Sequence, residues 1–336
     1  MRSGDSDLSV TGRAANPSFP ELTLAGQSQL INLAPWIRTF TTGKAGMATE
    51  TAPAHTTLPV AQLIPDYPIS FDAWKGFEAD ISLDIDSLTG LVRPLEDLQS
   101  AFSLQRDGLR VDKLFFDDGV NGSVALTGSL VDQDKTPQLD LALNGESLIY
   151  GMPKAPGEDA DALPAYDVKL RLTGSGQTTR TLANSLNGYL NLAMGSGHIL
   201  NTGFDRLSNT FLQELSNAFN PYKEQQAMTA INCAAVFNTF ENGQAFGEPS
   251  IVVDTPKIKI LANTHVSFDT EKVKASFKTI PQKGLGINLS SLVNPFVEVT
   301  GTLSAPRISL NPANTVVGGS LAVVTGGLSL LLISGI

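Results

Sequence analysis

The sequence has few of the residues on which catalytic and metal sites usually depend. It contains one cysteine and three histidines in 336 residues, so no disulfide can form within the chain. It has no G-x-S-x-G, H-E-x-x-H, P-loop or C-x-x-C motif, and His55, His198 and His265 lie far apart in sequence. We therefore expect no enzyme, no metal site and no cofactor. Cys233, within AINCAAVF, is expected to be a small buried residue.

Charged residues are also scarce, and their balance is acidic. They make up 17% of the chain, whereas an average soluble domain has about 25%. The formal net charge is -10 and the pI is about 4.8. Nucleic-acid binding needs a concentration of Lys and Arg, so this balance argues against it. It also disfavours docking on an anionic membrane through basic patches.

The two ends of the sequence lack the features expected at the ends of a complete chain. The first ten residues contain no apolar run, so we expect no signal peptide or N-terminal anchor in them. Leu8 and Val10 already alternate with polar residues, as in a strand. The last 21 residues, 316–336, carry no charge and include five glycines. We expect the chain to be a fragment whose Gly-rich apolar tail, residues 313–336, is truncated.

Alternation of apolar and polar residues dominates the rest of the chain. In ADISLDIDSL, for example, Ile81, Leu83 and Ile85 share one face and aspartates occupy the other. This period of two predicts half-buried strands, and the short turns between them favour an antiparallel sheet. Helical spacing appears only over residues 204–219 and 178–186. We expect a mostly β protein: an elongated, curved antiparallel sheet forming an open β-groove, with one or two short amphipathic helices.

A loosely repeated unit supports this fold class. VTGTLSAPRISL, residues 299–310, is echoed at residues 126–141 and 10–24, each copy having an apolar residue, Thr, Gly, a short polar run and a Pro. The Gly would let the strand bend or another group approach closely. The Pro would begin the next strand, where no ladder donor is needed.

Composition divides the chain into five predicted segments. Residues 1–40 are interpreted as the end of a preceding β repeat. Residues 41–66 include a Thr/Ala/Pro-rich stretch and are interpreted as a flexible linker. Residues 67–172 form a β-repeat segment, residues 173–312 a C-terminal β domain with helices, and residues 313–336 the tail.

The order of motifs resembles the C-terminal region of the AsmA family. The resemblance rests on QTTRTLANSLNGYLNLAMGSGHI followed by FDRLSNTFLQELSN, on TAINCAAVFNTFENGQA, and on FVEVTGTLSAPRISLNP before a Gly-rich apolar segment. Upstream, FDAWKGFEADISLDIDSL and LFFDDGVNGSVALTGSLVDQDKTPQLDLAL resemble the preceding repeats of the family. The resemblance covers most of the chain from about residue 66 onward.

The resemblance implies a large Gram-negative envelope protein that is periplasmic and anchored in the inner membrane by an N-terminal helix, which this chain lacks. Such proteins are similar to bridge-like lipid-transfer proteins, in which a curved sheet forms a hydrophobic groove. The resemblance further implies that the partners are phospholipids, the inner and outer membranes, and envelope assembly proteins. The family has no catalytic residues to carry over.

Two functions follow as hypotheses. The first is a lipid-transport bridge that carries phospholipid acyl chains between the inner and outer membranes. Burial of each CH2 gains about 0.8 kcal/mol, so an apolar face would hold acyl chains without special residues. The second is a scaffold or assembly factor for outer-membrane proteins, in which the apolar faces are closed cores. The residues predicted to line the groove are Leu126, Leu130, Leu139, Leu141, Leu143, Val297, Val299, Leu303, Ile308 and Leu310.

Overall fold

The mostly β, antiparallel fold predicted from the alternation is confirmed. The computed structural model describes residues 2–3, 6–35, 63–72, 75–91, 93–149, 163–200, 228–256, 258–282 and 296–311. Fifteen strands follow one another in the order β19-β18-β17-β16-β15-β14-β11-β10-β9-β8-β7-β6-β5-β4-β3. The chain divides into an N-terminal unit, Met1–Ala61 with Ser70–Gly151, and a C-terminal unit, Gln62–Ile69 with Met152–Ile336. The five sequence segments remain predictions.

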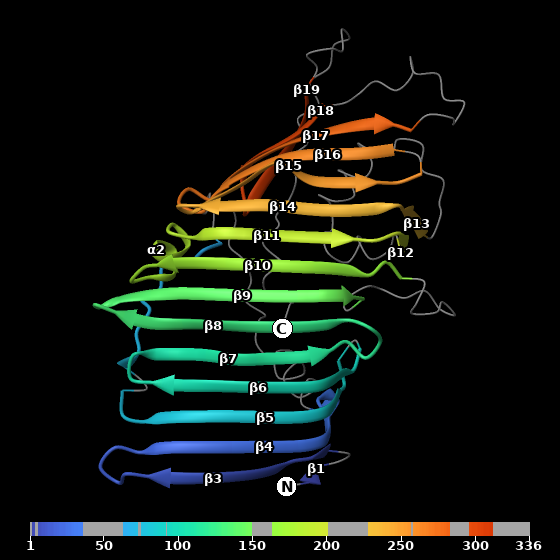
Figure 1. Cartoon of the computed structure of the whole chain (residues 1–336). Helices are drawn as coiled ribbons and strands as arrows, with labels where there is room; N and C mark the ends of the chain where they lie inside the picture. The colour runs from blue at the N-terminus through green and yellow to red at the C-terminus, as the bar shows by residue number, and fades with distance from the viewer. Residues whose placement is uncertain are drawn as a thin grey trace, which may run out of the picture. The chain divides into compact units, whose positions relative to one another are not determined.

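The N-terminal unit is a sheet of strands lying side by side (Figure 1). Its strands are β3 (Ser9–Ala15), β4 (Glu21–Asn32), β5 (Glu78–Thr89), β6 (Leu95–Gln105), β7 (Gly108–Asp117), β8 (Ser123–Gln133) and β9 (Thr136–Leu148). The short strands β1 (Arg2–Ser3) and β2 (Ser6–Asp7) pair with each other. One pairing departs from the expected pattern, because β4 and β5 are parallel. Parallel neighbours need a crossover of a dozen residues or more, and residues 33–77 supply it.

The C-terminal unit contains the remaining strands of the large sheet. They are β10 (Tyr166–Ser175), β11 (Asn187–Met194), β14 (Cys233–Glu241), β15 (Gln244–Asp254), β16 (Ile258–Ser267), β17 (Lys272–Pro281), β18 (Phe296–Thr302) and β19 (Ala305–Asn311). A separate pair is formed by β12 (Gly197–Leu200) and β13 (Met228–Ile231). The pairings described for these strands are all antiparallel.

One of the two predicted helices is confirmed. Helix α2 (Thr179–Ala183) begins after Thr178, whose hydroxyl accepts a hydrogen bond from the Thr181 backbone N–H. The Thr181 hydroxyl in turn accepts one from the Thr178 N–H, which completes a capping box. The helix predicted over residues 204–219, most of the predicted linker and the tail at 313–336 lie outside the described residues.

The repeated sequence unit is a β-hairpin at each of its three places: β3–β4, β8–β9 and β18–β19. Its Pro lies at the start of the second strand, as predicted, at Pro137 in β9 and Pro306 in β19. Its Gly allows a close approach. A Cβ on Gly12 would lie 2.8 Å from Leu24 Cδ2, and one on Gly128 would lie 3.0 Å from Leu141 Cδ1. The cross-strand leucine therefore lies over the glycine.

Candidate functional site

The five groove residues predicted in the N-terminal unit lie together on one face of the β8–β9 hairpin. Directly opposed residues in an antiparallel pair share a face. The register opposes Leu126 to Leu143 and Leu130 to Leu139, and it places Leu141 opposite Gly128. The sequence prediction therefore identified a continuous patch of leucine side chains here.

This apolar face extends across all seven strands from β3 to β9. A single row of cross-strand neighbours runs through the unit: Gly12, Leu24, Ile81, Phe102, Val111, Gly128 and Leu141. Neighbouring strands lie about 4.8 Å apart, so such a row is roughly 29 Å long. The opposite side of β5 carries exposed aspartates instead. We call the first side of the N-terminal unit the leucine face.

The side chains of the leucine face are half-buried. Leu24, Ile81, Phe102, Val111 and Leu141 are neither exposed nor fully enclosed. Among the described residues, the substantial contacts between elements are those of neighbouring strands, apart from β2 with β4 and α2 with β10. At one place a described strand outside the large sheet lies on this side: β2 contacts β4, and the Ser28 hydroxyl donates to the Asp7 carbonyl. No other described strand outside the large sheet makes substantial contact with the strands of this face.

The groove residues predicted in the C-terminal unit have a different environment. Val297 and Val299 on β18 are 0% and 3% exposed. They pack in a closed core with Ala262, Ala275 and Phe277. These two valines therefore contact other protein side chains and do not border an open surface.

The last three predicted residues follow β18. Leu303 lies in the turn between β18 and β19, half-buried, and its N–H donates to the Glu271 carbonyl at 2.8 Å. Ile308 and Leu310 pair with Val299 and Val297 through the backbone. Their side chains lie outside the described part of the structure.

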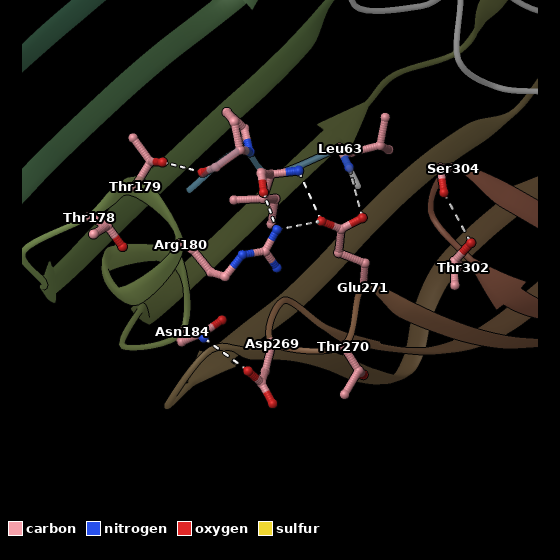
Figure 2. A network of polar contacts seen from close by, with 12 residues as sticks. Leu63, Thr178, Thr179, Arg180, Asn184, Asp269, Thr270, Glu271, Thr302 and Ser304 are labelled. Carbon is pink, nitrogen blue, oxygen red and sulfur yellow. Dashed lines mark hydrogen bonds and ion pairs between the residues drawn. The ribbon is translucent and has the colours of Figure 1, made fainter. Parts of the chain in front are cut away.

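A buried carboxylate, which the sequence reasoning missed, lies in the turn between β16 and β17. Glu271 is 3% exposed. Its two oxygens accept hydrogen bonds from the backbone N–H groups of Leu63, at 2.8 Å, and Ile64, at 3.0 Å. The Arg180 guanidinium lies 3.5 Å from Oε1. Figure 2 shows the carboxylate between these partners.

Further contacts hold the segment around Leu63 against α2. We call residues 63–69 the strap. The Thr179 hydroxyl donates to the Pro65 carbonyl and accepts from the Tyr67 N–H at 3.1 Å. The Thr179 N–H donates to the Tyr67 carbonyl at 2.9 Å, and Pro68 forms a β-bridge with Thr178. Within the C-terminal unit, the strap is therefore held by hydrogen bonds to Glu271 and Thr179 and by a short ladder with α2.

A second buried carboxylate closes a loop of the N-terminal unit. Asp118, in the stretch DDG, is 1% exposed. It accepts hydrogen bonds from the N–H groups of Val120 at 3.1 Å, Gly122 at 2.9 Å and Ile149 at 2.9 Å. Such multiple backbone donors satisfy a carboxylate that has left water. Its role is structural, because every contact is to a backbone amide.

Two of the lowered pKa values among the described residues, those of Asp107 and Asp254, arise from hydrogen bonds at a turn and at a strand end. The Arg110 guanidinium, at 2.6 and 2.9 Å, holds the pKa of Asp107 below its ordinary value. The Asn232 amide at 2.9 Å, followed by the Lys259 ammonium at 3.0 Å, lowers the pKa of Asp254. These groups belong to polar contacts and not to the leucine face.

Cys233, His198 and His265 do not assemble into a site among the described residues, and His55 lies outside those residues. The prediction that Cys233 is buried is wrong: it is exposed. It pairs with Asp254, while its neighbour Ala234 pairs with Val253, so alternation turns the thiol to the polar face. His198 is exposed in β12, and His265 stacks on Phe246 with ring centroids 6.5 Å apart. No metal-binding cluster occurs among the described residues.

Within the described part of the chain, no helix has both the length and the apolar character needed to cross a membrane. Comparison of the chain with protein-family models, with curated proteins and with solved structures gave no match.

Proposed function

We propose that this chain is part of a lipid-transport bridge, in which the leucine face holds phospholipid acyl chains. The observation that carries the proposal is the row of apolar residues across seven strands. Its side chains on β4 to β7 and on β9 are half-buried, and apart from β2 beside β4 no described strand outside the large sheet makes substantial contact with it. A one-sided sheet gains free energy by placing its apolar face against something apolar. An acyl chain offers such a surface and requires no specific polar partner.

The chemistry at the face would be passive. Leu126, Leu130, Leu139, Leu141 and Leu143 would replace water around the acyl chain, and each CH2 so covered contributes about 0.8 kcal/mol. Polar headgroups would remain in water beside the sheet. No bond is made or broken, and no cofactor is needed. We propose, as the resemblance to the AsmA family implies, that the chain works in the periplasm between the inner and outer membranes, as part of a protein anchored to the inner membrane.

Transfer of a fluorescent phospholipid between donor and acceptor vesicles tests the proposal. Leu141→Asp introduces a charge in the middle of the leucine face and should reduce the rate of transfer to the protein-free level. Thr127→Asp is a matched control, because Thr127 lies on the opposite, exposed side of β8. Its transfer should equal that of the wild type. Equal transfer by both variants would remove the leucine face from the mechanism.

A second candidate function is a scaffold for the assembly of outer-membrane proteins. The observation that favours it is the closed core around Val297 and Val299, since closed apolar faces leave no path for lipid. Partners would then add a strand to an exposed edge, and β3 is the outermost strand of the N-terminal unit, with six of its seven residues exposed. Loss of partner binding on placing a proline in β3, with lipid transfer unchanged, would favour this function.

A further inference from the structure

The polar side of β5 carries a stripe of unpaired negative charge. Asp80, Asp84 and Asp86 are exposed, with the half-buried Ser82 between them. None of the three aspartates forms an ion pair among the described residues. We call these four residues the acidic stripe. Because they alternate with the apolar Ile81, Leu83 and Ile85 of the leucine face, their side chains all leave the same side of one strand.

The polar side of β17 carries the opposite charge. Lys272, Lys274, Ser276 and Lys278 are all exposed, and they alternate with the core residues of that strand. We call them the basic stripe. Lys274 has a neighbouring carboxylate, Glu298, at 3.8 Å, which is longer than a charge-assisted hydrogen bond of about 2.8 Å. Lys272 and Lys278 form no ion pair within the described residues.

The two stripes have complementary order and equal spacing. Residues 80–86 are Asp-x-Ser-x-Asp-x-Asp, and residues 272–278 are Lys-x-Lys-x-Ser-x-Lys. Residues on the same side of any strand are about 7 Å apart. When the two strands run in opposite directions, each residue of one stripe therefore lies opposite a residue of the other. With the strands antiparallel, every charge meets its opposite and serine meets serine: Lys272 with Asp86, Lys274 with Asp84, Ser276 with Ser82 and Lys278 with Asp80.

We propose that the basic stripe of one copy of this chain docks on the acidic stripe of a second copy. The basic stripe is exceptional in a chain of net charge -10, and its charge complement is present on every other copy. Stacked sheets lie about 10 Å apart, a gap that a long lysine and a short aspartate bridge together. A partner outside this chain would need the same sequence of charges by coincidence.

The contact is heterologous, because it joins two different surfaces. Heterologous contacts generate rings or open chains instead of a closed two-fold dimer. Exposed ion pairs are individually weak, so association should appear as protein concentration rises and should disappear at high ionic strength. The inference does not depend on lipid transport, because this association between copies would form whatever the function of the leucine face is.

Sedimentation velocity of the full chain over a range of concentrations tests the proposal. At low ionic strength the wild type should show species larger than a dimer, which return to monomer in about 1 M salt, where the Debye length is about 3 Å. Two variants reverse one stripe each. The first carries Lys272→Glu, Lys274→Glu and Lys278→Glu, and the second carries Asp80→Lys, Asp84→Lys and Asp86→Lys.

Each reversed variant alone should remain monomeric, because its two stripes then have the same sign. An equimolar mixture of the two should associate again, since the stripes of one variant complement those of the other. A chain carrying all six substitutions should also associate. Circular dichroism confirms that each variant is folded. A control with the same change in net charge, Lys135→Glu with Lys169→Glu and Arg307→Glu, alters exposed cations outside both stripes and should associate as the wild type does.

Three results would overturn the proposal: a monomeric wild type at every concentration and low ionic strength, reversed variants that associate like the wild type, or a mixture that stays monomeric. Flotation with vesicles containing an anionic phospholipid tests the main alternative, in which the basic stripe binds a membrane surface. Vesicle binding that depends on the basic stripe, in a chain that does not self-associate, would assign the stripe to a membrane surface in place of a second copy. Lipid transfer is measured separately, so either proposal can fail while the other stands.

Discussion

Replacing Glu271 with alanine should release the strap from the turn between β16 and β17, within the C-terminal unit. The carboxylate is 3% exposed and is the acceptor for two strap N–H groups and the partner of Arg180. Hydrogen bonds to a charged group contribute about 1.5–3 kcal/mol each. Removing one member of a buried pair costs about 3–5 kcal/mol, because the other charge remains without compensation.

Water can replace part of what is lost. The Leu63 and Ile64 residues are half-buried, and the Arg180 guanidinium keeps its hydrogen bond to the Ile64 carbonyl. We therefore expect the low end of the range, about 3 kcal/mol. The backbone contributes little to the difference, since residue 271 has φ of 53° and alanine is strained there as glutamate is.

Hydrogen exchange at the Leu63 and Ile64 amides measures this effect directly. A loss of about 3 kcal/mol corresponds to roughly a hundredfold faster exchange, and protection of the amides in β8 and β9 should not change. Glu271→Gln should show a smaller loss, because one amide oxygen can still accept a bond. Asp269→Ala removes a neighbouring exposed carboxylate that bonds only Asn184 among the described residues, and it serves as the control. Unchanged exchange of the strap in a folded Glu271→Ala variant would refute the reasoning.

Four further substitutions test the packing and the electrostatics. Phe277→Ala, in the closed core, should lower the free energy of unfolding by about 3–5 kcal/mol, whereas Leu139→Ala, on the half-buried leucine face, should cost about 1 kcal/mol in the same urea titrations. Asp118→Ala should cost about 3 kcal/mol, because it leaves buried N–H groups without their acceptor. The pKa of Asp107 is lowered by Arg110, so its stabilising contribution is complete above about pH 4 and lost as pH falls through the lower folded pKa. Urea midpoints at decreasing pH should show this loss in the wild type and not in Asp107→Asn.

Local pattern was sufficient to predict most of the strands. Alternation is a property of neighbouring residues, so Ile81, Leu83 and Ile85 identified both the strand and its apolar face. The short helix after Thr178 was likewise indicated by the local apolar spacing within residues 178–186. The parallel pairing of β4 with β5 was not predicted, because it depends on where a long crossover returns and not on either strand alone.

The shared face of the β8–β9 leucines was predictable from sequence, but the burial of the individual candidate residues was not. Leu141 and Val297 look alike in sequence, each an apolar residue in an alternating strand. One is half-buried and the other is 0% exposed, because Val297 belongs to a buried cluster that includes residues of β16 and β17, which local sequence does not indicate. The burial of Glu271 was not predicted. Its contacts with the strap join positions about two hundred residues apart, and no local pattern indicates them.

Native mass spectrometry of the full chain, purified in gentle detergent, is the most direct test of the leucine face as a lipid site. The account predicts that phospholipid masses remain bound to the wild type and to Thr127→Asp, and that they are lost in Leu141→Asp. A wild-type chain that is cooperatively folded and carries no phospholipid would contradict it, since the half-buried leucines would then be stable without an acyl chain against them.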